Sequence, residues 1–235
     1  MSWLKPELAP GVSALITTRE GPDGQQDFNL ATHAGDQVDV AANRQRVIAE
    51  LGMSDIQWLE QVHGSDVCYV DQVDPIAKVC DAVWTDHQAV GLAIMTADCV
   101  PILLSDAGGA VVGAAHAGWQ GVKGKVVTAL IAQMPVRADQ LSAYIGPAIG
   151  KESYEVGEDV WSQFPSEFTY PHADPTKRYL DLVGLVGAEL EELGVRSPQV
   201  AGECVYRNDA YYSHRATQAK GRVAGRFVSA IGLKN

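Results

Sequence analysis

Three side chains in this sequence are of the types that hold zinc at catalytic sites: His63, Cys99 and His116. Each lies in an otherwise apolar stretch that contains glycine or proline. One thiolate and two imidazoles fill three of the four positions of a tetrahedral zinc and leave the fourth for water or substrate. Residue type alone does not establish such a site, because buried cysteines are commonly small apolar groups and histidines near turns are commonly structural.

The elements expected around these side chains are short strands. Leu92–Met95 is an apolar run that ends just before Cys99, and residues 110–115 form a similar run just before His116. Strand ends carry the loops on which active sites are usually assembled. If the two strands are neighbours, Cys99 and His116 converge in one cleft, and His63 completes the set from the loop after residue 60.

The wider pattern predicts mixed α/β layers. Short apolar or alternating runs between residues 57 and 112 indicate a central sheet. Helical spacing covers Asp39–Leu51, Gly124–Met134 and Tyr179–Leu193. The polar segment Phe164–Lys177 is read as a surface excursion, so residues 1–235 are predicted to form a single catalytic domain.

Composition limits the classes of function. A net charge of −11 and a pI near 4.9 argue against a nucleic-acid interface, which normally needs a basic surface. No apolar run approaches the roughly 20 residues that cross a bilayer, and the N-terminus lacks the pattern of a signal peptide. Four scattered cysteines do not suggest a disulfide framework. We therefore expect a cytoplasmic protein with no membrane partner.

Several ordered motifs resemble those of the YfiH/PgeF family, historically called polyphenol oxidase or laccase-domain proteins. The similarity extends from Thr17-Thr18-Arg19 to Gly221-Arg222 and so covers nearly the whole chain. The motifs that carry it include Asn29-Leu30-Ala31-Thr32-His33-Ala34-Gly35-Asp36, Gln61-Val62-His63-Gly64, Asp81-Ala82, Met95-Thr96-Ala97-Asp98-Cys99-Val100-Pro101, Ala115-His116-Ala117-Gly118-Trp119, Ile145-Gly146-Pro147-Ala148-Ile149-Gly150 and Tyr212-Ser213-His214-Arg215.

This resemblance implies an α/β (α+β) fold, a single-domain αββα sandwich with mixed central sheets, and a zinc ion held by His63, Cys99 and His116, with copper binding there only by substitution. It also implies phosphorolysis of adenosine, inosine, guanosine and methylthioadenosine, with adenosine deamination as a companion reaction. Bacterial members are further linked to peptidoglycan editing, in which a wrongly attached serine is removed from a cytoplasmic muropeptide precursor. The expected partners are therefore a purine nucleoside and phosphate, bound by a monomer or small homo-oligomer.

Phosphate must be held by cationic groups, and the candidates are Arg19, Arg215 and Arg222. In an acidic protein, however, such arginines also serve as surface ion-pair partners. His33 is a candidate pocket residue, or else a hydrogen-bonded loop histidine. Gln120 stands where the family commonly has arginine, which removes one positive charge near the expected anion site.

Asp98 is the candidate catalytic acid or base, since deamination needs a carboxylate to move a proton. Residues next to each other on a strand point to opposite faces, so Asp98 is equally a candidate for anchoring a turn or orienting a metal ligand.

Three other functions compete with this interpretation. Cys99 and His116 are also the residue types of a cysteine-type hydrolase, for which the muropeptide is the natural substrate. A zinc-stabilised interaction module would need a fourth protein ligand, and we identify only three. A laccase is disfavoured, because the six histidines are too scattered to form several copper clusters.

Overall fold

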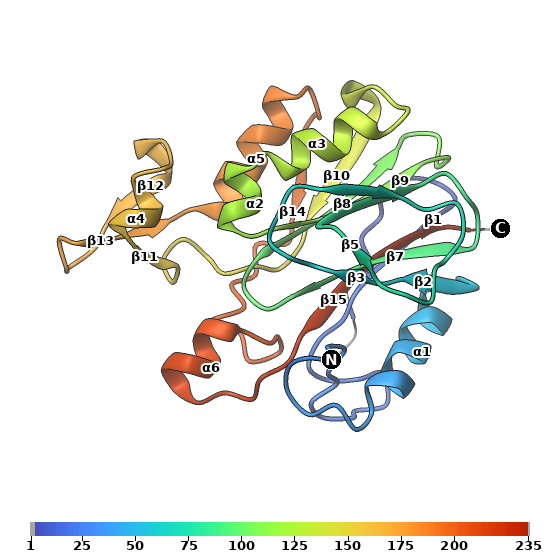
Figure 1. Cartoon of the computed structure of the whole chain (residues 1–235), viewed down its shortest axis with the longest axis horizontal. Helices are drawn as coiled ribbons and strands as arrows, with labels where there is room; N and C mark the ends of the chain where they lie inside the picture. Colours follow the sequence, from blue (N-terminus) through green and yellow to red (C-terminus); the bar gives the residue numbers. More distant parts are fainter. Residues whose placement is uncertain (1–2, 235) are drawn as a thin grey trace.

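Two β-sheets face each other at the centre of the structure (Figure 1). The computed structural model describes residues 3–234. The smaller sheet has the order β1 (Val12–Ile16), β15 (Phe227–Leu233), β7 (Val90–Thr96) and β2 (Asp55–Gln57). The larger sheet has the order β14 (Gln199–Val200), β10 (Leu141–Ile145), β8 (Val100–Asp106), β9 (Val112–Ala117), β6 (Ala82–Thr85) and β4 (Val67–Tyr69).

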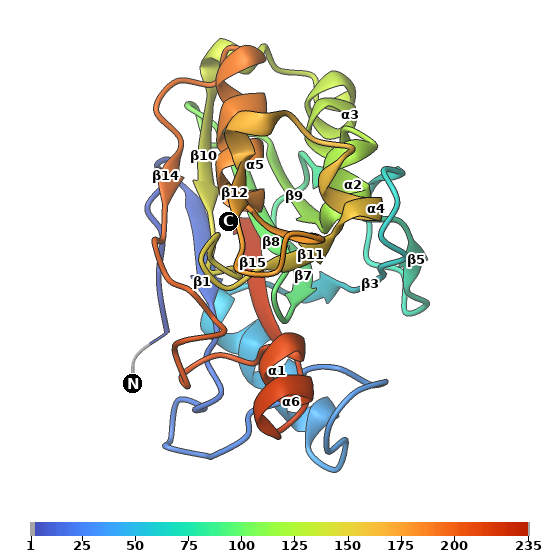
Figure 2. The same cartoon turned by 90° about the vertical axis from the view of Figure 1, so that its left-hand side faces the viewer.

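Helices cover the outer faces of both sheets, as Figures 1 and 2 show. Helix α1 (Val40–Leu51) packs on the smaller sheet. Helices α2 (Trp119–Lys123), α3 (Val126–Gln133) and α5 (Leu182–Glu192) pack on the larger one. The resulting order is helix, sheet, sheet, helix, so the predicted αββα sandwich with mixed sheets is confirmed.

Alternation along the strands explains why two sheets and two helical layers form. In β8, Ile102 and Leu104 pack against the helices, whereas Leu103 points into the space between the sheets. In β7, Met95 packs against α1, whereas Ile94 points into the same central space. Both strands are therefore buried on two faces, which is why they read as continuous apolar runs.

Smaller elements lie at the ends of these layers. Strands β3 (Leu59–Glu60) and β5 (Lys78–Val79) pair with each other, and helix α6 (His214–Lys220) precedes β15. The predicted surface excursion, Phe164–Lys177, is part of a longer projection that contains pairing strands and extends to one side in Figure 1. The elements of this projection are β11 (Glu155–Gly157), α4 (Glu158–Trp161), a 3-10 turn (Ser166–Phe168), β12 (Thr169–Pro171) and β13 (Lys177–Leu180). A separate 3-10 turn (Ala138–Gln140) precedes β10.

The predicted helices occur with small shifts at their ends. The largest shift concerns Tyr179, which belongs to β13 because it pairs with Glu155 and Tyr170. Helix α5 begins only after Asp181, whose carboxylate accepts a hydrogen bond from the Gly184 N–H at 2.8 Å. Asp181 thus acts as the N-cap. No helix within residues 3–234 is long and apolar enough to cross a membrane.

Candidate metal centre and substrate cavity

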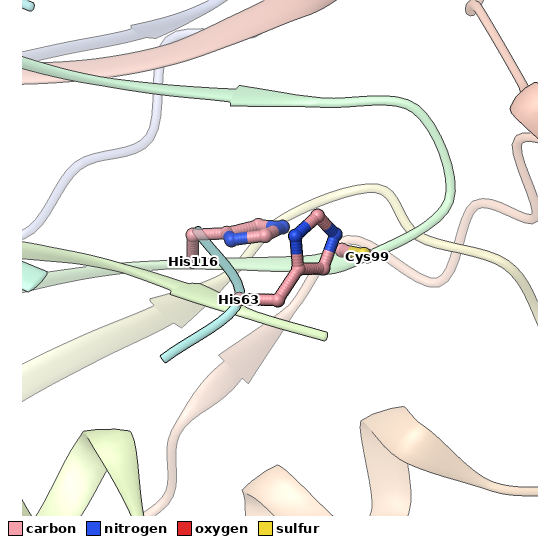
Figure 3. A group of neighbouring side chains, drawn as sticks. All are labelled: His63, Cys99 and His116. Carbon is pink, nitrogen blue, oxygen red and sulfur yellow. The ribbon is translucent and has the colours of Figure 1, made fainter. Parts of the chain in front are cut away.

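His63, Cys99 and His116 converge in the structure, as Figure 3 shows. Their ligand atoms all lie within 4.8 Å of one another, and the two imidazole rings meet nearly edge to face. Across residues 3–234 this is the single group of three or more histidine, cysteine or acidic side chains with such spacing. We call it the metal end of the site, although the role of these residues as metal ligands stays a prediction.

Strand pairing brings Cys99 and His116 together. Strand β8 runs antiparallel to β9, and its second residue, Pro101, is the partner of His116. His116 lies on the same face of β9 as Val112 and Ala114, which pack between the two sheets. The metal end therefore lies at the edge of the space between the sheets, where the strands end and side chains become accessible.

Backbone strain marks the loops that carry this group. His63 has a φ of 62°, and Asp98, which precedes Cys99, has a φ of 109°. Residues other than glycine rarely adopt positive φ, and such conformations persist only where the surrounding structure holds them. The contacts of Asp81 and Asp98 supply that support.

Asp81 connects two members of the metal end. Its carboxylate accepts hydrogen bonds from the backbone N–H groups of Val62, His63 and Gly64. The same carboxylate lies 2.7 Å from Nδ1 of His116. Burial acts to raise the pKa of Asp81, but the hydrogen bonds from His116 and Gly64 outweigh it and lower that pKa. An ionised Asp81 therefore accepts from Nδ1–H of His116 and leaves Nε2 as the atom that would bind a metal once it gives up its proton.

The electrostatics of the metal end favour a thiolate. Burial opposes ionisation of Cys99, yet the charge of His116 and hydrogen bonds from His116 and His63 lower the pKa of Cys99 to about 6. Burial likewise lowers the pKa of His116, but the Cys99 charge and the Asp81 hydrogen bond raise it to about 9. A thiolate at neutral pH is the form that binds metal and the form that attacks as a nucleophile.

The donor set and its surroundings fit a zinc ion. Zinc prefers tetrahedral nitrogen and sulfur ligands, and the same donors accept copper. Gly118 lies against the group: a Cβ atom added there would lie 3.0 Å from Cδ2 of His63 and 3.2 Å from Sγ of Cys99. The missing side chain at Gly118 thus lets two of the three side chains approach each other.

A cavity of about 970 Å³ opens beside the metal end. This volume is ample for a nucleoside together with an anion. Its walls combine soft ligands, aromatic rings and three arginines. The lining residues are Thr32, His33, Arg44, Trp58, Leu59, Glu60, Gln61, His63, Ala77, Met95, Thr96, Ala97, Asp98, Cys99, His116, Trp119, Gln120, Tyr154, His214, Arg215, Gln218 and Arg226.

The cavity includes some of the predicted substrate contacts and not others. His33 and Arg215 line it, as does Gln120. Arg19 lies elsewhere, in an ion pair with Asp27. Arg222 also lies elsewhere and donates hydrogen bonds to four backbone carbonyls, those of Val205, Tyr206, Asn208 and Tyr211. These contacts give Arg222 a structural role in holding the segment before α6.

Asp98 is buried and uses both carboxylate oxygens to hold α6. One oxygen accepts from the Ser213 hydroxyl at 2.6 Å, and the other accepts from the Arg215 backbone N–H at 2.7 Å. Burial raises the pKa of Asp98 despite these hydrogen bonds. The turn-anchoring role considered from the sequence therefore describes its contacts, while a catalytic role stays a prediction.

Sequence reasoning missed four residues of the site: Arg44, Arg226, Thr96 and the positioning carboxylate Asp81. Asp81 was visible only as part of a short motif. Arg44 lies among the polar residues of an amphipathic helix, a position that normally faces solvent. Nothing in the sequence signalled that Arg44 and Arg226 line one cavity.

The layered fold and the cluster of soft ligands define a class of αββα proteins with a single three-ligand site beside a large cavity. The chain belongs to the YfiH family, described as "Multi-copper polyphenol oxidoreductase laccase", which matches residues 13–234. It is 34% identical to a purine nucleoside phosphorylase of Pseudomonas aeruginosa, over 100% of this chain and 99% of that protein.

Further relatives agree. The purine nucleoside phosphorylase YfiH of Escherichia coli is 33% identical over 94% of each chain, and a purine nucleoside phosphorylase of Deinococcus radiodurans is 38% identical over 97% of this chain and 91% of its own. A crystal structure of a Neisseria meningitidis protein superposes with a TM-score of 0.90 at 33% identity over the whole of both chains. YlmD of Geobacillus stearothermophilus gives 0.87 at 29% identity, over 100% of this chain and 97% of that one.

Proposed function

We propose that this protein is a zinc-dependent purine nucleoside phosphorylase that accepts adenosine, inosine, guanosine and methylthioadenosine. The observation that carries the proposal is one cavity that holds His63, Cys99 and His116 at one end and arginines in its walls. The phosphorylase names of relatives that match over nearly their full length support the same reaction.

The reaction requires an anion held against a sugar and a purine able to leave. A phosphate oxygen forms a bond to the anomeric carbon, the bond from that carbon to the purine nitrogen breaks, and the purine takes up a proton. Cationic side chains of the cavity hold the phosphate and balance its charge. Tyr154 and Trp58 line the cavity with aromatic surface suited to a purine or ribose.

When bound, a zinc ion would be held by His63, Cys99 and His116 and would supply a Lewis acid for the purine, or an acidified water for deamination. Asp81 keeps His116 oriented, and the Asp98 contacts with Ser213 and the Arg215 backbone keep α6 against the cavity. Adenosine deamination as a companion reaction would need a proton carrier, for which Asp98 is our candidate.

The test is a mass-spectrometric product assay of zinc-quantified protein with adenosine and inosine, each with and without phosphate. We expect free purine base and ribose 1-phosphate only when phosphate is present. Inosine formed from adenosine without phosphate identifies the deaminase. A Cys204→Ala variant should give the same products as the unaltered protein, because this thiol lies outside the cavity and contacts Gly150 and Ser153. Absence of every product from zinc-loaded protein would refute the proposal.

A second candidate is a cysteine-type hydrolase that removes the misplaced serine from a muropeptide precursor. One observation favours it: Cys99, His116 and Asp81 are arranged as a thiolate, an imidazole and an orienting carboxylate. Metal content separates the two proposals, since a zinc-bound thiolate is poorly placed to attack. Hydrolysis of the muropeptide by metal-free protein would favour the hydrolase.

A polyphenol oxidase reaction has little support from the site, despite the name of the family. Multicopper chemistry needs several ligand clusters, and the described part of the chain contains one group of three ligands. We also propose that residues 1–235 act as one catalytic domain in the cytoplasm, as a monomer or small homo-oligomer. Fractionation of cells tests the location, and light scattering of the purified protein tests the oligomeric state.

A further inference from the structure

None of the three arginines of the cavity has an acidic partner among residues 3–234, and Arg215 donates to the Glu155 backbone carbonyl at 2.9 Å. Arg44 comes from α1 and Arg226 directly precedes β15, and neither forms an ion pair with any residue in the range 3–234. The protein has a net charge of −11, so unpaired cations facing a cavity are unexpected here. Partly buried charges are normally paired, because removal from water is costly.

The Arg44 guanidinium and the Arg226 backbone contact the same residue, Leu30, and the Arg226 guanidinium donates to the Gly225 carbonyl at 2.8 Å. Nε of Arg44 donates to the Leu30 carbonyl at 3.1 Å, and the Leu30 N–H donates to the Arg226 carbonyl at 3.2 Å. The Arg44 guanidinium also stacks on Trp58, 3.9 Å from the ring centroid. These contacts leave most N–H donors of both guanidinium groups without a protein acceptor. They also fix the backbone from which the two side chains extend.

His33 lines the same cavity as both arginines and lies within reach of their charges. The pKa of His33 is lowered by burial and then by the charges of Arg226 and Arg44, so both charges act on one imidazole. The side chain of Asn29 fixes the loop that carries His33 by donating to the carbonyls of Ala31, Ala34 and Asp36. We call His33, Arg44 and Arg226 the cation end of the cavity.

Thr96 is a polar residue of the cavity lining that the cation end does not need. Its side chain is 1% exposed, and its hydroxyl oxygen is buried without a hydrogen-bond partner within the described chain. Thr96 pairs with Phe227 across β7 and β15, and neighbouring residues at a strand end, such as Arg226 and Phe227, point to opposite faces. The cation end is therefore assigned to the arginines and His33.

We propose that Arg44 and Arg226 form an oxyanion subsite, with His33 at its rim, that takes the phosphate dianion. This proposal rests on the proposed phosphorolysis, for which it names the phosphate-binding residues. Arginine forks match the geometry of phosphate oxygens and can bind them through two parallel hydrogen bonds. The charges of Cys99 and Asp98 act on Arg226, so phosphate bound to Arg226 lies within electrostatic reach of the metal end.

The test measures phosphate binding apart from catalysis. Inorganic phosphate is titrated by calorimetry into zinc-depleted protein and into zinc-loaded protein, with adenosine and adenosine monophosphate as separate arms. We expect Arg44→Gln and Arg226→Gln each to weaken binding of inorganic phosphate about tenfold or more, and to leave adenosine affinity within about twofold. Adenosine monophosphate that binds through these arginines while inorganic phosphate does not would overturn the choice of ligand.

Arg46→Gln is the matched control, since Arg46 lies on the same helix and pairs with Gln25 and Asp23 outside the cavity. Unchanged phosphate affinity in both folded cavity variants would overturn the proposal. A second measurement uses the unaltered protein, so it does not depend on variants that fold. Crystals soaked in tungstate should place the oxyanion between the guanidinium groups of Arg44 and Arg226, and a position elsewhere in the cavity would also overturn the proposal.

These outcomes separate the subsite from the reaction. Phosphate binding that depends on both arginines, without cleavage of any nucleoside, refutes the proposed reaction and leaves the subsite standing. Nucleoside cleavage whose KM for phosphate is unaffected by Arg44→Gln and Arg226→Gln refutes the subsite and leaves the reaction standing.

Discussion

The two ends of the cavity are built in different ways. The metal end uses short side chains at strand ends, and one buried carboxylate, Asp81, fixes both His116 and the loop of His63. The cation end uses two long side chains, Arg44 from α1 and Arg226 from just before β15. The Leu30 backbone and Trp58 hold the Arg44 guanidinium, and the Gly225 carbonyl accepts from the Arg226 guanidinium. Rigid geometry is thus concentrated where a metal needs fixed ligands, and longer, adjustable groups lie where an anion would enter and leave.

The largest effects are expected from removing the members of the metal end. His63→Ala, Cys99→Ala and His116→Ala should each weaken zinc binding by about a thousandfold or more, because zinc affinity depends on every deprotonated ligand. Competition with a chromophoric chelator measures the affinity, and Cys204→Ala is the control thiol. If all three variants keep tight zinc binding, the metal end is misassigned.

Asp81→Asn tests whether one carboxylate organises the metal end. We expect zinc affinity to fall by up to about 100-fold, which is typical when a group that orients a metal ligand is lost. The absorption spectrum of the cobalt-substituted protein should change as well, which a purely structural loss of stability would not produce. Asp86→Asn is the matched control, because Asp86 follows the other end of β6 and bonds to Tyr69. Equal zinc affinity and spectra in both variants would count against the role of Asp81.

Arg222→Met separates a structural arginine from those of the cation end. It should lower the free energy of unfolding by about 2 kcal/mol, since the guanidinium satisfies four backbone carbonyls. Phosphate affinity of the folded protein should stay unchanged. Urea unfolding measures the first effect, with the exposed Arg137→Ala as the control. A variant that loses phosphate binding at full stability would place Arg222 in the substrate site.

Gln120→Arg is expected to have the smallest effect. Gln120 lines the cavity, so a positive charge there should lower the KM for phosphate about threefold through partly screened attraction. Steady-state kinetics at two salt concentrations measure the change in the KM for phosphate, which should be smaller at high salt. An unchanged KM at both salt concentrations would show that residue 120 does not act on the phosphate site.

The contrast between the two ends also explains how far the sequence could be interpreted. Residue type and the apolar runs before Cys99 and His116 predicted that these residues converge if their strands are neighbours, because strand ends place short side chains within narrow limits. The family resemblance was needed to turn that condition into a full set with His63. The layers followed from alternation in strands and spacing in helices.

The cation end could not be predicted in this way. Arginine side chains are long, so their position depends on tertiary contacts that no local pattern encodes. Arg222 belongs to a sequence motif yet holds backbone carbonyls, whereas Arg44 looked like part of a solvent-facing helix surface and lines the cavity. Asp81 was equally hard to assign, since its role arises from a contact with His116 across 35 positions of sequence.

The strand order of the smaller sheet has a consequence for synthesis of the protein. Strand β15 lies between β1 and β7 and is hydrogen-bonded to both, so those two strands have no partner in common until residues 227–233 leave the ribosome. The three members of the metal end are all translated by residue 116, whereas Arg226 emerges together with β15. The three side chains that we propose as metal ligands are therefore translated before Arg226, which we propose as a ligand of the anion.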